Sequence, residues 1–439
     1  VVILTLAMLI GSLALIEMAS QDAALAACDA RVAQSLFCAE SGVEKAEAWL
    51  KAQTSRPTSL IFPFGDEPES FADGLMLVSI DPTPVGDYMV YTILSLATVE
   101  GKSRAVEVDV TPTSFTDFLY FTHRNVGIGT PGYFVTGEEI DGPVFVNDEL
   151  AILGDPVFHG AVRCAGSTIL YYNDGSPTSL TTFSNSPYDE PDFQEGCLLG
   201  VDVMEWLAQE ARSTIGGLAD LTLNGNHDVV FGRDTGTATL TGCVSYTKAG
   251  KGKWTDVDLS AFNGIIYVNG DCNVSGVVDG QVTVVSNGSM NIVDDLVVAD
   301  SDANGPREDC DDIIGLVAGT KLNIEDNVPN GDDCVIHAHM IAINNSGGLV
   351  EQYSQGSPRG TLTIWGGIAQ DRWGPTGTGY YDGDGVYHVL TGYERDVHYD
   401  WRLRTMLPPG YESIVFSGGG LERLGWREVT PVNLEEWES

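Results

Sequence analysis

The chain has 439 residues, of which 62 are acidic and 22 basic, and its formal net charge is −40. This balance argues against nucleic-acid binding, because phosphate recognition needs a basic surface, and against polybasic attachment to anionic lipid. Hydrophobic residues make up 43% of the chain, so the acidity indicates a charged surface on a folded protein and not disorder. The length allows two or three domains, at roughly 150 residues each.

The first predicted element is one helix over residues 1–51. Its start, Val1–Ile16, carries no charge, and the first proline is Pro57. A segment that is apolar on all sides must be buried in lipid or protein. Two interpretations stay open: a membrane anchor with a stalk, or a helix that is stored in the membrane and later packs among identical helices. The core-forming part is residues 1–25, with Val1, Leu4, Leu9, Leu13, Ile16 and Leu25 as its polymerisation residues.

A small antiparallel sheet is predicted next, within residues 52–113. Residues 74–81, 87–101 and 102–112 each alternate apolar and polar side chains, and turn residues separate them. Alternation with period two is typical of strands that bury one face. The three segments therefore predict a meander of three strands.

The rest of the chain is predicted to be a large β-rich head, with residues 114–260 as one region, including a helix at 201–219, and 261–439 as another. Short β units recur, and the glycine corners Gly270, Gly288 and Gly319 lie 18 and 31 residues apart. Regular corners favour a parallel β-solenoid in the second region. An antiparallel sandwich is the alternative. The predicted fold class is thus α+β and mostly β: a long N-terminal α-helix, a small antiparallel sheet and a β-solenoid-like head.

Particular blocks of the sequence resemble known proteins. The helix end AESGVEKAEAWL (Ala39–Leu50) and the sheet after it resemble the type IV pilin-like superfamily. Further blocks resemble an uncharacterised bacterial family of large pilin-like proteins with an N-terminal pilin helix and a β-rich head. These blocks are Asp117–Asn125, Ile140–Val162, Asp311–Ala318, Thr361–Gly377 and Thr391–Tyr411.

The resemblance implies a structural subunit of an extracellular type IV pilus-like filament, which is not an enzyme. Its partners would be further copies of itself and, before assembly, the pilus assembly machinery and the inner membrane; no nucleic acid is expected. Thr5 stands where classical pilins carry a glutamate. Either Val1 is not the first residue of the mature chain, or the chain resembles the pilin-like subunits that lack this glutamate. The second case favours a minor or tip subunit or adhesin as the alternative. A membrane-anchored β-solenoid enzyme acting on polysaccharide is a remote alternative that rests on fold analogy alone.

Calcium is the only cofactor predicted. Asp300, Asp302 and Asn304, followed by Gly305, reproduce the first half of a calcium loop, and Asp311 stands at its twelfth position. The alternative is a solvated acidic loop. Two histidines further on, His337 and His339, could begin a zinc site on a strand, but the sequence offers no third ligand.

Eight cysteines without a CxxC pair fit an oxidising compartment. Cys28 and Cys38 lie about 15 Å apart along the predicted helix, too far to pair with each other. They predict an intersubunit disulfide; two buried thiols where the helix meets the head are the alternative. The other six predict three disulfides within the head, with Cys310–Cys334 the favoured pair: Cys164, Cys197, Cys243, Cys272, Cys310 and Cys334.

Overall fold

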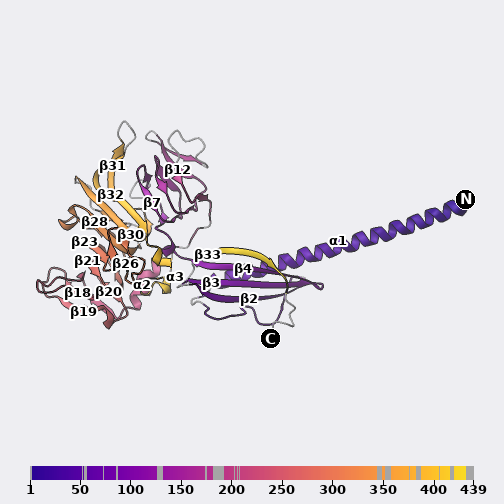
Figure 1. The fold of residues 1–439 in the computed structure, drawn as a ribbon, viewed down its shortest axis with the longest axis horizontal. Coiled ribbons are helices and arrows are strands. Elements are labelled where there is room, and N and C mark those ends of the chain that lie inside the picture. Colours follow the sequence, from indigo (N-terminus) through magenta and orange to yellow (C-terminus); the bar gives the residue numbers. More distant parts are fainter. Residues whose placement is uncertain are drawn as a thin grey trace. The chain divides into compact units, whose positions relative to one another are not determined.

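The computed structural model describes residues 2–431 except 52, 54–56, 73, 86–87, 126–131, 174–175, 181–191, 202, 205, 207, 344–348, 352–356, 375, 382–386, 405 and 416–419. The chain forms two compact units (Figure 1). We call Val1–Pro112 with Leu421–Ser439 the stalk unit, and Thr113–Gly420 the head. The predicted order of a long helix, a small antiparallel sheet and a large β-rich region is confirmed.

The stalk unit begins with one unbroken helix, α1 (Val2–Lys51). Its second half buries residues spaced three or four apart, namely Ala39, Val43, Ala46 and Leu50. This spacing places them on one face of the helix, and that face packs against a sheet. The helix predicted over residues 1–51 is therefore confirmed for the residues that the structure describes.

The sheet of the stalk unit has five strands in the order β1-β2-β3-β4-β33. The predicted meander is confirmed, because β2, β3 and β4 pair antiparallel in sequence order. Val106, Val108 and Val110 alternate with more exposed residues and face the core under α1. The strands are β1 (Glu69–Phe71), β2 (Gly74–Val85), β3 (Tyr88–Val99), β4 (Lys102–Thr113) and β33 (Gly420–Val429).

One domain boundary differs from the prediction. The sequence assigned residues 261–439 to a single solenoid-like region, but β33 joins the sheet of the stalk unit beside β4 (Figure 1). The head is therefore inserted in the chain between two neighbouring strands of one sheet. Residues 114–260 and the rest of the head also form one compact unit and not two.

Helix and sheet approach each other closely at Gly42. A Cβ atom there would lie 2.1 Å from the Ser95 hydroxyl oxygen and 2.8 Å from the Met76 sulfur. Ser95 is fully buried on β3. Only a residue without a side chain lets α1 lie this near the sheet.

Most strands of the head are stacked in parallel ladders. In one ladder, β16 (Leu221–Asn224), β20 (Ile265–Asn269), β22 (Gln281–Ser286), β26 (Ile313–Ala318), β28 (Cys334–Ala342) and β30 (Pro358–Arg372) each pair with the next. A second ladder runs through β17 (His227–Phe231), β21 (Cys272–Val278), β23 (Met290–Val298), β27 (Leu322–Ile324) and β29 (Leu349–Glu351). Such parallel neighbours are not those of an antiparallel sandwich.

The predicted glycine corners lie on top of one another between these ladders. The Gly288 amide donates to the Gly270 carbonyl at 3.1 Å, and the Thr320 amide beside Gly319 donates to the Gly288 carbonyl at 3.1 Å. Stacked asparagines follow the corners: Asn323 donates to Asn291 at 3.0 Å, and Asn291 to Asn273 at 2.9 Å. The winding of the whole head as a single solenoid stays a prediction, which these repeated contacts support.

The first ladder continues beyond β30 into the earliest strands of the head. β30 pairs in parallel with β5 (Tyr120–Arg124), which is followed by β8 (Val144–Val146), β11 (Val162–Cys164) and β15 (Cys197–Leu199). A branch leads from β30 through β32 (Tyr387–Tyr399) and β7 (Glu139–Asp141) to β10 (Val157–Phe158) and β14 (Asp192–Phe193).

The remaining strands are short and lie at the margins of these ladders. A separate sheet has the order β13-β12-β9-β6, and hairpins extend from the ladders. These strands are β6 (Phe134–Val135), β9 (Leu150–Leu153), β12 (Ile169–Asn173), β13 (Ser176–Leu180), β18 (Cys243–Lys248), β19 (Thr255–Asp258), β24 (Ser301–Asp302), β25 (Gly305–Pro306) and β31 (Gly377–Tyr381).

Both faces of the first ladder are apolar. Val284 belongs to the main hydrophobic core of the head, whereas its neighbour Val285 belongs to a second core outside the ladder, because successive residues of a strand point to opposite faces. This second core is covered by α2 (Ala208–Gly217), α3 (Glu412–Val415) and the 3₁₀ turn η1 (Phe115–Asp117). Three more 3₁₀ turns are described: η2 (Leu259–Ala261), η3 (Pro329–Gly331) and η4 (Trp401–Arg404). The helix predicted at 201–219 thus begins only at Ala208.

Candidate functional site

The first half of α1 exposes an apolar surface along its whole length. Leu9, Leu13, Ile16 and Leu25 each expose 57–66% of their surface, and the first charged residue is Glu17. Of the other residues predicted for polymerisation, Val1 lies outside the described residues and the side chain of Leu4 is not described. The structure thus places the described polymerisation residues on a helix surface that its own chain leaves uncovered.

Such a surface is unfavourable in water, since each Å² of apolar area removed from water stabilises a bound state by about 25 cal/mol. By length and composition alone, α1 also contains a segment long and apolar enough to cross a membrane. The exposed half of α1 can therefore be covered either by lipid or by other apolar helices.

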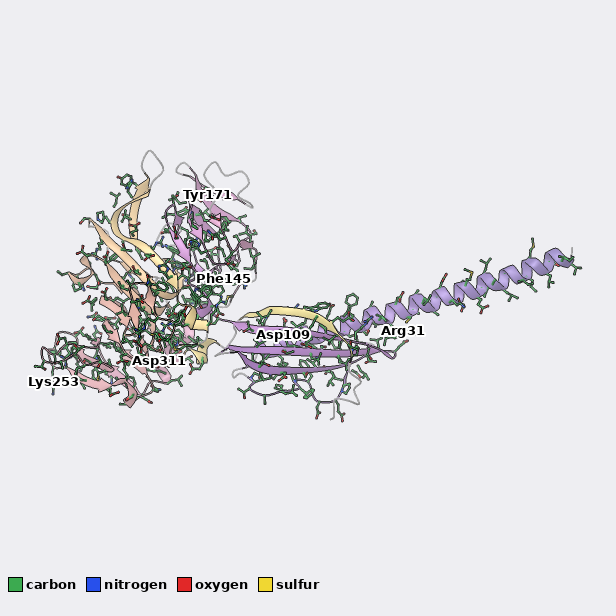
Figure 2. The ribbon with its side chains drawn as sticks, in the orientation of Figure 1. Arg31, Asp109, Phe145, Tyr171, Lys253 and Asp311 are labelled. Carbon is green, nitrogen blue, oxygen red and sulfur yellow. The ribbon has the colours of Figure 1, made fainter. Side chains whose placement is uncertain are left out.

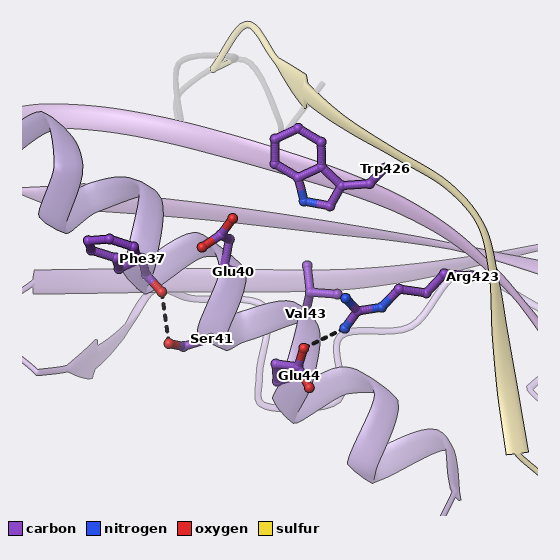
Figure 3. Close-up of a pocket in the computed structure, with 7 residues that line it drawn as sticks. All are labelled: Phe37, Glu40, Ser41, Val43, Glu44, Arg423 and Trp426. Atoms are coloured by element: carbon purple, nitrogen blue, oxygen red, sulfur yellow. Dashed lines mark hydrogen bonds and ion pairs between the residues drawn. The ribbon is translucent and has the colours of Figure 1, made fainter. Parts of the chain in front are cut away.

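The second half of α1 is fixed to its own sheet by ion pairs. Arg423 on β33 donates to Glu47 at 2.6 Å. It also pairs with Glu44, as Figure 3 shows. The hydrogen bond to the Glu47 carboxylate, followed by the bond to Glu44, raises the pKa of Arg423 above its ordinary value. The side chain of Glu47 is only 10% exposed. Without Arg423 this carboxylate would be nearly buried without a cation.

An open groove of about 400 Å³ lies between α1 and β33 in the stalk unit (Figure 3). The aromatic rings of Phe37 and Trp426 border the groove and are 66% and 50% exposed. Its other lining residues are Glu40, Ser41, Val43, Glu44 and Arg423. The groove combines two exposed rings with carboxylates, and it could not be predicted from the sequence, because its two walls are far apart in the chain.

The predicted calcium residues form a tight hairpin and not a converging set of ligands. Asp300 forms an ion pair with Arg307, and the carboxylate of Asp302 accepts the Asn304 amide at 2.7 Å. Asp311 is exposed. Within the described residues, no three acidic, histidine or cysteine side chains are grouped so that they could hold a metal ion. Calcium binding stays a prediction that nothing here tests.

The two histidines of the weak zinc prediction are buried on β28. Burial lowers the pKa of His337 to about 4 and that of His339 to about 3. His339 packs against the rings of Phe115 and Tyr411, and its Nε2 atom has no hydrogen-bond partner in the described part of the chain. The surroundings of both side chains are those of core residues.

All eight cysteines are described, and none of them forms a disulfide in the structure. The three head disulfides therefore stay predictions. Cys38 is 4% exposed and belongs to the core between α1 and its sheet, whereas Cys28 is half-buried. This burial favours the alternative of inert thiols over an intersubunit disulfide at Cys38. In the head, burial raises the pKa of the Cys334 thiol to about 12.

Together these features define a class of protein: a polypeptide with an uncovered apolar helix, fixed by its second half to a small sheet that carries a large β-rich head. Residues 92–167 match the model of a family described as a domain of unknown function (DUF4900). No curated protein matches the chain. Among solved structures, the chain is similar to the competence-associated pilin ComZ of Thermus thermophilus, at 10% identity and a TM-score of 0.33, over 91% of this chain and 97% of that one.

Proposed function

We propose that the chain is a structural subunit of an extracellular type IV pilus-like filament. The observation that carries this proposal is the division of α1 into two halves. The second half is buried against its own sheet, and the first half exposes apolar side chains on every side. A helix with this division is suited to two successive states, inserted in a membrane as a precursor and packed among identical helices in a polymer.

The ion pairs of Arg423 support this division of roles. They attach α1 to β33, the last strand of the stalk unit, and so hold the apolar half at a defined position relative to its sheet. A polymer of identical subunits needs this constancy, since each helix must meet its neighbours in the same way. No catalytic role is proposed for any residue.

A minor or tip subunit, or an adhesin, of the same machinery is the second candidate. The large β-rich head, Thr113–Gly420, motivates it. Subunits at a tip need fewer identical contacts than those along a fibre.

The test is to shear the filaments from cells that express the chain, and then to examine that fraction by electron microscopy and quantitative mass spectrometry. Filaments made mostly of this chain support the first candidate. Trace amounts in filaments of another subunit support the second. Absence of the chain from every filament fraction, while it stays in the membrane, would overturn both and leave the anchored-protein interpretation.

A further inference from the structure

The head carries a basic tip on a chain that is otherwise strongly acidic. Lys248, Lys251 and Lys253 are three of the seven lysines of the chain. They lie at the turn between β18 and β19, and all three are exposed. Figure 2 shows Lys253 at an extremity of the head. We call these three residues the lysine tip.

The three lysines of the lysine tip form no ion pairs with the described residues of their own chain. In the described residues, none of these three ammonium groups forms an ion pair, whereas ten arginines do. Behind the tip, Arg233 pairs with Asp256 at 2.9 Å and lies over the Trp254 ring at 5.2 Å. The base of the hairpin is thus fixed by contacts of its own, while its tip presents three free cations to a partner.

The same head carries an acidic loop, Asp300–Asp312, at another place on its surface. Asp302, Glu308 and Asp311 are exposed, and their carboxylates form no ion pair in the described part of the chain. The loop is held in shape by Asp312, which accepts the amides of Gly280 at 2.6 Å and of Asp300 at 3.2 Å. Asp311 lies apart from Lys253 in Figure 2, so tip and loop of one head are not in contact.

We propose that the lysine tip of one copy binds the acidic loop of the next copy in the filament. The proposal rests on the proposed function, because the apolar helices must first bring the heads together. Two different patches that complement each other make a heterologous contact, and such contacts generate open polymers when the rotation between copies does not close a ring. Chains with a net charge of −40 repel one another. A local contact of opposite charges therefore also fixes which faces meet.

A second copy fits the tip better than a free polyanion does. The tip offers only three lysines, and a nucleic acid or acidic polysaccharide would also meet the repulsion of the whole head. A neighbouring subunit is already held by its helix, so the tip need not supply the affinity. Each surface ion pair adds only a little stability, but that is enough to select an orientation within a polymer.

The experiment uses sheared filaments of the full chain and a carbodiimide, which joins an amine to a carboxylate only where the two are in contact. We expect a covalent dimer on denaturing gels, and peptides from its band should link Lys251 or Lys253 to Glu308 or Asp311. Loop variants Glu308→Lys plus Asp311→Lys should lower the yield of this dimer at least fivefold. Adding Lys251→Glu and Lys253→Glu should restore it, now with the amine and carboxylate exchanged.

The control is Lys102→Glu, which changes an exposed lysine at the start of β4 in the stalk unit and should leave the dimer yield unchanged. Filaments that form normally but yield no link between tip and loop would overturn this inference and leave the proposed function standing. The inference would also be overturned, with the proposed function left standing, if Lys251→Glu plus Lys253→Glu left the dimer yield unchanged but abolished the binding of added polygalacturonate to the filaments. The partner of the lysine tip would then be an external polyanion. Absence of wild-type filaments would instead count against the proposed function.

Discussion

The Gln370 side-chain amide donates a hydrogen bond to the Thr122 hydroxyl at 3.2 Å, although 248 positions separate the two residues. Both side chains are buried, and Ile368 pairs with Tyr120 on the same two parallel strands. Asp371 and Arg124 add an ion pair at the edge of this contact. Strand β30 of the first ladder therefore packs on β5, the first strand of the head. The head cannot complete its core until nearly all of its chain is present.

Enlarging Gly42 should destabilise the stalk unit. In Gly42→Ala the new methyl group meets the Ser95 hydroxyl at 2.1 Å, and such overpacking lowers the free energy of unfolding by about 1–3 kcal/mol. Hydrogen exchange of stalk-unit peptides, measured by mass spectrometry, should show faster exchange. Adding Ser95→Ala removes the clashing oxygen and should recover part of the loss. Gly11→Ala is the control, because nothing lies within 4 Å of its new methyl group; equal effects at both glycines would contradict the packing described here.

Removing the middle of the asparagine stack should loosen the head. Asn291→Ala eliminates a hydrogen bond to Asn273 at 2.9 Å and another from Asn323 at 3.0 Å. Leaving the buried Asn323 amide without this partner costs about 1–3 kcal/mol. We expect a lower urea concentration at the midpoint of unfolding of the head, as measured by pulse proteolysis. Asn304→Ala, at an exposed hairpin position, should change it little. An unchanged midpoint in Asn291→Ala would mean that the stack contributes nothing to stability.

The head should lose stability as the pH falls from about 6.5 to about 4. Burial lowers the pKa of His337 to about 4 and of His339 to about 3, so the unfolded chain binds protons at these sites before the folded chain does. The free energy of unfolding is therefore highest above pH 6.5, where both histidines are neutral in the folded and the unfolded chain. It falls as the pH is lowered, because the unfolded chain takes up protons first. In His339→Gln the urea midpoint should depend less steeply on pH within this window. The same slope in variant and wild type would contradict the enclosed, neutral imidazole.

Deleting residues 1–25 should yield a soluble monomer that keeps its fold. Among the described residues, none of the deleted part belongs to the core between α1 and its sheet, so circular dichroism should still show the β signal of the sheet and head. Size-exclusion chromatography should give one monomeric species. A deletion variant that still polymerises at micromolar concentration would show that the apolar half of α1 does not drive assembly.

The two helix cysteines should differ in reactivity. Maleimide should modify the half-buried Cys28 faster than Cys38, which is 4% exposed, in the detergent-solubilised chain. Denaturation should make the rates equal. Non-reducing gels of filaments should then show monomers. A disulfide-linked ladder that disappears in Cys38→Ser would instead restore the intersubunit bond and require α1 to separate from its sheet.

Features that depend on neighbours in the sequence were predictable. The long helix follows from the charge-free start and the absence of proline before Pro57, and the meander follows from alternation within three adjacent segments. The stacked corners Gly270, Gly288 and Gly319 were visible because turn residues recur where coils repeat. The exposed apolar surface of α1 could be predicted for the same reason, since its composition alone makes it apolar.

Features that depend on residues far apart in the chain could not be predicted from the sequence. Nothing within the sequence of β33 indicates that it pairs with β4. The backbone hydrogen-bonding groups along the edge of a strand are the same whichever strand pairs with it. Arg423 was missed for this reason, although Glu47 on a buried helix face was a signal that some cation must come near it. The acidic segment at Asp300 suggested a metal, but its own Arg307 neutralises part of it.

The insertion of the head between β4 and β33 has a consequence for synthesis and for damage. The strand that carries Arg423 leaves the ribosome only after the entire head, so the sheet of the stalk unit receives its last strand only when the head has been synthesised. Afterwards two peptide connections join head and stalk unit. A protease that cuts one of them leaves the head attached to the stalk unit through the other.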